Sequence, residues 1–240
     1  MHFPILMYHQ VDAPPARGTP MRGLVVAPGT FAWQMRMLQL MGYRGVSMRE
    51  LMPYLAGERT GRVVGVTFDD GYRNNLQHAL PVLQRLGFTA TCYAVSGQTG
   101  GDNAWDHGQG VPSKPLMTAA ELRQWAAAGM EVGAHTRHHR DLTTLDERQA
   151  RDEIEGSKHD LEALLGEPVQ HFCYPYGRFR PEHAEWARAA GYLSATTVNR
   201  GRAVPGSDPF TLPRVLVSRS THPGYFFLKL ATRYEDRRGH

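Results

Sequence analysis

The chain alternates between short runs that are apolar throughout and longer segments whose apolar residues recur at helical spacing. Runs such as 63–68 and 89–95 lack the polar alternation of a half-exposed strand. Uninterrupted apolar runs of this length are typical of parallel strands covered on both faces. Segments such as 146–165 instead repeat apolar residues every three or four positions, and most of them end at a glycine. That pattern indicates amphipathic helices with left-handed C-caps.

Strand-like and helical segments follow one another along the whole chain, which predicts a parallel sheet covered by helices. The expected strands are 4–11, 63–68, 89–95, 131–135, 169–174, 193–198 and 212–217, with a short strand or turn before a helix in 46–55. The expected helices are 30–41, 74–86, 119–128, 146–165, 181–190 and 224–234. About seven strands suit a closed or nearly closed sheet better than a small open one. We therefore expect an α/β fold, a distorted (β/α) barrel in a single domain over 1–240.

Composition limits the classes of function. Hydrophobic residues make up 41% of the 240 residues, enough for a substantial core. The net charge is +4 and the isoelectric point about 9.2, but the only basic cluster, 233–238, also contains Glu235 and Asp236. We therefore expect no nucleic-acid partner. The absence of an apolar run of about 18 residues predicts no membrane span.

Two further features bear on the compartment. The chain starts without a basic-then-apolar export signal, which predicts a cytoplasmic protein; a leader removed upstream would make export the expectation instead. Cys92 and Cys173 both lie in apolar, strand-like runs. We expect them to be small buried hydrophobic residues, with a disulfide as the less favoured alternative.

Candidate chemistry begins where the run 63–68 ends, at Asp69, Asp70 and Gly71. An unpaired carboxylate is costly in a core, so two of them mark a site or a solvated turn. Neighbouring strand residues normally face opposite ways, but Gly71 offers a break that would turn both carboxylates toward one cleft. The alternative is an aspartate that caps the helix beginning near residue 74, beside a solvated neighbour.

Two histidines follow another predicted strand, 131–135. His135 and His139 are four positions apart, so one helical turn would place both imidazoles on one face. Two histidines and one aspartate make three protein ligands and leave a position open, which is the pattern of a catalytic metal site. The neighbouring His138 would point elsewhere, and we expect it at the surface.

The third stretch is Tyr-Pro-Tyr-Gly at 174–177, again at the end of a predicted strand. Proline and glycine on either side of Tyr176 fix an unusual backbone path, which can present an N–H outward. Such an N–H can stabilise an oxyanion. Taken alone, the stretch is equally an ordinary turn.

Together these stretches resemble the polysaccharide deacetylase family, also called the NodB-homology domain or carbohydrate esterase family 4. The resemblance is to its motifs Thr-Phe-Asp-Asp-Gly, here at 67–71, His-Thr-x-x-His, at 135–139, and Pro-Tyr-Gly, at 175–177. The opening 4–9 is also similar to the usual start of that family, so the resemblance covers nearly the whole chain. It implies a distorted (β/α) barrel that carries a divalent metal, zinc first, with cobalt, nickel or manganese as alternatives.

The resemblance also implies roles for individual residues. Asp70, His135 and His139 would hold the metal, and Asp69 would be the catalytic base. Tyr176 would lend its backbone N–H to the oxyanion and, with Pro175, line the pocket for the acetyl group.

The chain departs from the commonest family pattern at one charged position. Many members carry an arginine two residues before the proline of the third motif, where Cys173 stands here. The Tyr-Pro-Tyr-Gly version looks like a subgroup that includes exopolysaccharide-modifying deacetylases. We expect Arg214, on the predicted strand 212–217, to supply the missing cation beside Asp69 as part of the catalytic set. The alternative is a surface arginine.

The general acid has no clean match, because the late Leu-His segment of the family is missing. His222 is the nearest candidate by order, and His9, at the end of the first strand, competes for a role in the site. Trp105 and Asp106 lie on a turn-rich insertion, 97–115, and we expect Trp105 to bind substrate as a sugar platform or lid. The alternative is that Trp105 only anchors the loop.

The leading hypothesis is a metal-dependent hydrolase that removes N-acetyl groups from an amino sugar in a polysaccharide or glycan precursor. A carbohydrate substrate is then the expected partner. A second hypothesis keeps the metal but assigns a non-polysaccharide amide or an acetyl ester as substrate. A third is a catalytically silent carbohydrate-binding domain of the same fold. The sequence leaves the sugar, its chain length and the oligomeric state open.

Overall fold

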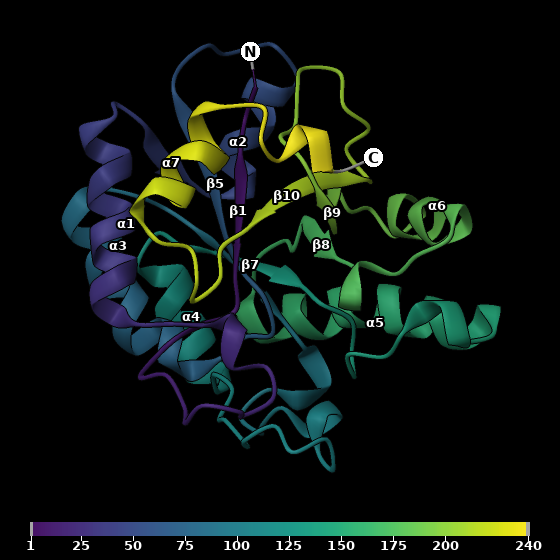
Figure 1. Ribbon diagram of the computed structural model, residues 1–240. Coiled ribbons are helices and arrows are strands. Elements are labelled where there is room, and N and C mark those ends of the chain that lie inside the picture. Colours follow the sequence, from purple (N-terminus) through teal and green to yellow (C-terminus); the bar gives the residue numbers. More distant parts are fainter. Residues whose placement is uncertain (1, 239–240) are drawn as a thin grey trace.

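The computed structural model describes residues 2–238, and its central feature is a closed barrel of parallel strands ringed by helices (Figure 1). Neighbouring strands around the barrel are β1 (Ile5–Tyr8), β5 (Val63–Phe68), β6 (Thr91–Ala94), β7 (Glu131–Ala134), β8 (His171–Cys173), β9 (Ser194–Arg200) and β10 (Leu212–Leu216). Strand β10 pairs back with β1 and so closes the sheet. The prediction of a distorted (β/α) barrel of about seven strands is confirmed.

Three short strands lie beside this ring. Strand β4 (Arg44–Val46) pairs with the first half of β5, and β6 takes over that edge from Thr67 onward. Strands β2 (Gln10–Val11) and β3 (Val25–Val26) form a separate pair. The single strand predicted over 4–11 is therefore interrupted at His9, which belongs to neither β1 nor β2.

Seven α-helices cover the barrel within residues 2–238, close to the predicted segments. They are α1 (Pro28–Leu40), α2 (Met48–Leu55), α3 (Leu80–Leu86), α4 (Ala119–Ala127), α5 (Glu147–Leu165), α6 (Pro181–Ala189) and α7 (Pro223–Ala231). Helix α1 begins earlier than predicted because Pro28, rather than Thr30, starts it after an extended Ala27. Proline suits the first helical position, where its missing N–H would be unpaired anyway.

The predicted helix 74–86 is divided. Residues Asn75–Ala79 form one turn of π-helix before α3 begins. The side-chain amide of Asn75 makes two hydrogen bonds. Its Nδ2 donates to the carbonyl of His9 over 2.7 Å, and its Oδ1 accepts from the backbone N–H of Val11 over 3.1 Å. These two bonds hold the chain on both sides of the break between β1 and β2, so the irregular turn fixes the position of His9.

The helices bury apolar side chains against the outer face of the barrel. Phe31 and Trp125 are fully buried there, and Cys92 and Cys173 are buried and free, as predicted. At the amino-terminal end, Glu131 accepts hydrogen bonds from the hydroxyl of Thr91 and the N–H of Arg49. Glu131 thus joins β6, β7 and the start of α2 at that end, and the carboxyl ends of the strands face the opposite side.

Two long loops lie together over the carboxyl ends of the strands, at the lower side of Figure 1. They span 12–24 and 97–115, and the Lys114 ammonium joins them by an ion pair of 2.7 Å with the carboxylate of Asp12. No helix within residues 2–238 combines the length and the apolarity that crossing a bilayer requires.

Candidate active site and metal centre

Asp69 and Asp70 follow β5 and are almost completely buried, with 2% and 6% of their surface exposed. The sequence predicts a break in strand alternation at Gly71, but the left-handed backbone begins one residue earlier. Asp70 has φ 74° and Gly71 φ 81°. A left-handed aspartate is strained, and such strain persists where the surrounding structure fixes the residue. Both carboxylates consequently line the same cavity.

The segment 135–139 is not the helical turn that the spacing predicts. Thr136 and His139 are both left-handed, with φ 63° and 56°, and the Thr136 hydroxyl accepts from the His139 N–H over 3.0 Å. The two imidazoles of His135 and His139 still converge, with ring centroids 4.8 Å apart. A tight loop therefore achieves the approach that was expected from a helix.

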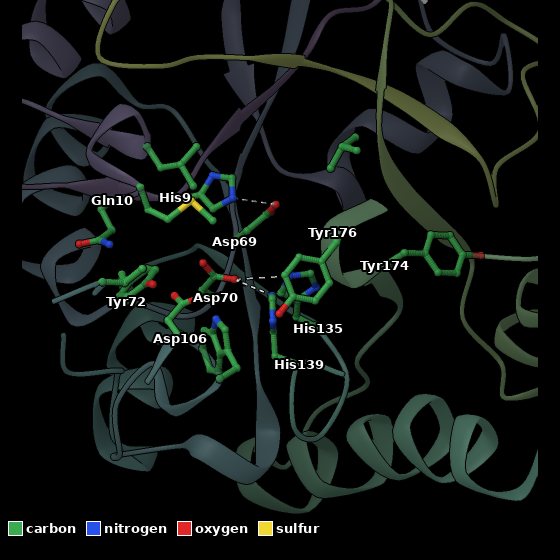
Figure 2. A pocket seen from close by; sticks show the side chains of 15 residues that line it. His9, Gln10, Asp69, Asp70, Tyr72, Asp106, His135, His139, Tyr174 and Tyr176 are labelled. Atoms are coloured by element: carbon green, nitrogen blue, oxygen red, sulfur yellow. Dashed lines mark ion pairs between the residues drawn. The ribbon is translucent and has the colours of Figure 1, made fainter. Parts of the chain in front are cut away.

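The two histidines and Asp70 form a donor set of the size that a metal needs (Figure 2). Oδ1 of Asp70 lies 3.4 Å from Nε2 of His135 and 3.3 Å from Nε2 of His139. A tetrahedral metal with ligands at about 2.0–2.1 Å separates those ligand atoms by about 3.3–3.4 Å. The residues present therefore fit a divalent metal of the zinc type.

The orientation of His135 supports the same conclusion. Its Nδ1 lies 2.7 Å from the carbonyl oxygen of Cys173. A proton on Nδ1 satisfies that carbonyl and leaves the lone pair of Nε2 directed toward Asp70. Metal-binding histidines are commonly fixed in this way by a hydrogen bond from the other ring nitrogen.

A second group, Asp69, His135 and Cys173, also brings potential ligand atoms within 4.8 Å of one another. The guanidinium of Arg214 already occupies that space. It donates to Oδ1 and Oδ2 of Asp69 over 2.6 and 2.7 Å and lies 3.2 Å from the sulfur of Cys173. A cation there would face a fixed positive charge, so this group does not fit a metal.

Arg214 is fully buried inside the barrel, and the alternative of a surface arginine is wrong. Strand β1 lies between β10 and β5, so the side chain crosses the barrel interior to reach Asp69. Its Nε donates to the carbonyl of Thr197 over 2.8 Å, and Nη1 contacts the hydroxyl of Thr67 over 3.1 Å. These bonds fix the plane of the guanidinium and therefore the plane of the carboxylate.

The surroundings keep both aspartates ionised. Burial alone would raise the pKa of Asp69, but the charge and hydrogen bonds of Arg214 outweigh it and lower that pKa. Burial would likewise raise the pKa of Asp70, and the neighbouring His135 and His139 hold it well below its usual range instead. Each oxygen of Asp69 keeps a second lone pair beyond its bond to Arg214, so the carboxylate can still accept a proton.

The turn after β8 presents a backbone N–H. Tyr176 is left-handed with φ 58°, and its N–H finds no acceptor in the described part of the chain. Pro175 is buried and does not line the cavity, contrary to its predicted contact with substrate. It starts the turn instead. A Cβ on Gly177 would lie only 2.3 Å from a methyl group of Val198, so this position requires glycine.

The two candidates for a proton donor are placed differently. His222 is exposed at the start of α7, with its ring against Tyr225, and it does not line the cavity. His9 does line it, and its Nε2 lies 4.0 Å from Oδ2 of Asp69 (Figure 2). The structure therefore favours His9 over the residue selected by chain order.

The insertion 97–115 contributes Trp105 and Asp106 to the cavity. The indole of Trp105 stacks on the ring of His139, with centroids 4.4 Å apart and planes 23° apart. The loop thus holds the imidazole of His139 in place. Tyr176 contacts the same imidazole edge-on, at 4.7 Å.

A sequence model of the polysaccharide deacetylase family matches residues 56–195, more than half of the chain. The chain belongs to the polysaccharide deacetylase family.

Several known proteins are similar to this family member over most of its length. The Bacillus subtilis protein YxkH is 29% identical over 217 residues, which are 90% of this chain and 71% of that protein. A Staphylococcus aureus poly-beta-1,6-N-acetyl-D-glucosamine N-deacetylase is 22% identical over 203 residues, 80% of this chain and 68% of that protein.

Solved structures show the same fold. IcaB from Ammonifex degensii superposes with a TM-score of 0.79 at 27% identity, over 96% of this chain and 97% of that one. A Streptococcus pyogenes deacetylase in complex with acetate superposes with a TM-score of 0.84 at 24% identity, over 96% and 98% of the two chains.

The family motifs account for only part of the cavity lining in this polysaccharide deacetylase family member. Residues outside every predicted motif complete the lining: Gln10, Met21, Leu24, Tyr72, Val111 and Val198. Gln10 and Tyr72 are sequence neighbours of predicted site residues, while the other four come from loops and a strand that lie far from the motifs in sequence.

Proposed function

We propose that the protein is a metal-dependent hydrolase that removes N-acetyl groups from an amino sugar in a polysaccharide or glycan precursor. The observation that carries the proposal is the metal-sized donor set of Asp70, His135 and His139 beside the arginine-held carboxylate of Asp69. Family membership and the N-deacetylase name of the staphylococcal relative support the substrate class. A silent binding domain would need neither the base nor the donor set.

Asp70, His135 and His139 would hold the metal, zinc first, with cobalt, nickel or manganese as alternatives. Bound there, the cation supplies a Lewis acid that polarises the acetyl carbonyl and lowers the pKa of the attacking water. Asp69 takes the proton from that water as its oxygen attacks the acetyl carbon. Arg214 keeps Asp69 ionised and oriented and does not itself touch the substrate.

Two further groups act on the substrate. The free N–H of Tyr176 donates to the oxygen that becomes negative in the tetrahedral intermediate, a contribution of about 2.7–4 kcal/mol in comparable sites. His9 donates a proton to the nitrogen as the C–N bond breaks. The hydroxyl of the water ends in acetic acid, which ionises to acetate, and the nitrogen leaves as the free amine with the proton from His9. The proton taken up by Asp69 replaces the one that His9 gave, so atoms and charge balance.

Removal of the metal tests the proposal directly. The purified protein is expected to release acetate from oligomers of β-1,6-linked N-acetylglucosamine. A chelator should lower the rate by about a hundredfold or more, and zinc or cobalt should restore it. Acetylated xylan is the comparison for an ester substrate. Acetate release that survives full metal depletion would refute the metal role, and activity on the ester alone would reassign the substrate.

A histidine pair tests the proton donor. His9→Ala is expected to lower kcat by about a hundredfold and to remove the fall in rate at high pH that reports loss of the donor's proton. His222→Ala is the matched control and should keep both the rate and the profile, since its ring lies outside the cavity. The opposite result, a lost limb in His222→Ala with a normal profile in His9→Ala, would return the role to His222.

A further inference from the structure

The cavity contains one carboxylate that the proposed chemistry does not use. Asp106 is only 7% exposed and lines the cavity together with the metal-binding residues (Figure 2). Its Oδ2 accepts a hydrogen bond from the Asn103 side chain over 3.3 Å, and its Oδ1 has no partner among residues 2–238. Protein atoms do not enclose this oxygen, and the residue lines the cavity, so Oδ1 is free to accept a hydrogen bond from a molecule bound there.

The loop that carries Asp106 is built to hold it still. Asn103 is fully buried, and its amide oxygen accepts from the N–H of Lys114 over 2.7 Å. The same amide group donates to the carbonyl of Pro112 over 3.3 Å, and the N–H of Asp106 donates to the carbonyl of Asn103 over 3.0 Å. Trp105, stacked on His139, fixes the loop to the metal-binding side. The carboxylate consequently has a set position relative to the metal ligands.

Charge defines what this carboxylate can bind. Asp69 is neutralised by Arg214, and Asp70 faces two imidazoles, but no lysine or arginine lines the cavity within residues 2–238. The oxygen atoms of the Asp106 side chain are hydrogen-bond acceptors, so the ligand group that fits them is a donor. Away from the metal position, this carboxylate also repels phosphate and carboxylate groups. A neutral ligand with hydroxyl or N–H groups meets both conditions.

The aromatic side chains beside Asp106 further limit the class of ligand that fits the cavity. Aromatic side chains of Tyr72, Trp105 and Tyr176 line the same cavity. Their flat apolar faces suit the C–H faces of a ring, while fixed polar groups set its orientation. A hydroxylated sugar ring combines apolar faces with hydroxyl donors at its edge.

We propose that Asp106 is a substrate-positioning residue that accepts a hydrogen bond from a ring hydroxyl of the amino sugar being deacetylated. It thereby selects neutral, hydroxylated rings over ligands that are anionic or lack hydroxyl groups. The proposal rests on the proposed function and names the group that distinguishes a sugar from other acetylated compounds.

The test compares two substrates of zinc-loaded protein. One is an oligomer of β-1,6-linked N-acetylglucosamine and the other is 4-nitrophenyl acetate, which has no hydroxyl. Asp106→Ala should lower kcat/KM on the oligomer by about tenfold to a hundredfold, chiefly by raising KM. The loss on 4-nitrophenyl acetate should be smaller by at least about tenfold. The kcat/KM of Asp106→Asn on the oligomer should lie between those of the wild type and Asp106→Ala, because its amide oxygen still accepts one hydrogen bond.

Asp102→Asn is the matched control on the same loop. Its carboxylate points away from the cavity, toward the Ser113 hydroxyl at 2.6 Å and the His107 ring at 3.2 Å. The control should keep the wild-type ratio of the two rates, which separates the Asp106 carboxylate from general loosening of the loop. Zinc per chain and the melting temperature are measured for every variant.

Several outcomes would overturn the proposal. Equal losses on both substrates, or loss of zinc from Asp106→Ala, would show a structural role at the metal centre. If the profile of kcat/KM against pH loses one limb in Asp106→Asn, then Asp106 transfers a proton and does not only position the substrate. Wild-type protein that deacetylates the oligomer, with Asp106→Ala equally active, would refute this proposal alone. Wild-type protein inactive on acetylated sugars would refute the proposed function as well.

Discussion

Asp69→Asn is expected to lower acetate release by about a hundredfold to ten-thousandfold while the protein keeps its metal. Asparagine has the shape of aspartate but cannot take the proton from the attacking water. The side chain of residue 69 belongs to the arginine pair and not to the metal donor set, because both of its oxygens accept from Arg214. The rate of acetate release should therefore fall in this variant while the zinc content per chain stays at the wild-type level.

Asp70→Asn is the matched variant at the neighbouring position. Its effect should begin with the metal, since Oδ1 of Asp70 is the carboxylate atom 3.3–3.4 Å from both imidazoles. Zinc per chain, measured after dialysis, and kcat, measured with excess zinc, distinguish the two variants. Zinc retained in Asp70→Asn and lost in Asp69→Asn would contradict the division of roles between the two residues.

Arg214→Met is expected to affect both stability and the pH dependence of the rate. Removing one partner of a buried ion pair costs about 3–5 kcal/mol, because the other charge stays buried without compensation. Arg214 lowers the pKa of Asp69 against the effect of burial. Without the guanidinium, burial raises that pKa, so the acidic limb of the kcat/KM profile should move to higher pH and the rate at neutral pH should fall.

Arg214→Lys is the control that keeps the positive charge at this position but not the planar guanidinium group. Lysine keeps the positive charge but cannot form the two parallel hydrogen bonds to Oδ1 and Oδ2 of Asp69. The acidic limb should therefore move less than in Arg214→Met, while the melting temperature still falls. Denaturant unfolding and a kcat/KM profile between pH 4 and 9 provide both readouts. A methionine variant with full turnover and an unshifted acidic limb would end this role for Arg214.

The elements of this fold were largely predictable because their signals are local. Apolar runs and helical spacing come from neighbouring residues, and the predicted stops at Gly87 and Gly166 are left-handed caps with φ 65° and 74°. The backbone of the site was not predictable in the same way. Thr136, His139 and Tyr176 adopt left-handed conformations, which are uncommon for any non-glycine residue and least expected for the β-branched Thr136, so no sequence signal replaced the expected helical turn.

Long-range contacts decided the remaining differences. His9 lies near Asp69 because β1 and β5 pair in parallel, with Tyr8 opposite Phe68. Order along the chain does not reveal that pairing and pointed to His222 instead. The role of Arg214 was expected on different grounds, the resemblance to a family in which many members carry an arginine where Cys173 stands here. Its bonds to Asp69 agree with that expectation and give a buried carboxylate the counter-charge that it needs.

Asp69 and its counter-ion are 145 positions apart, and the strand that carries Arg214 is the last of the barrel. In a nascent polypeptide on the ribosome, Asp69 is therefore translated long before the guanidinium that will neutralise it. Until then the carboxylate is better solvated than enclosed, which opposes premature closure of the sheet around it. We therefore expect the ion pair of Asp69 and Arg214 to form only when β10 joins the barrel.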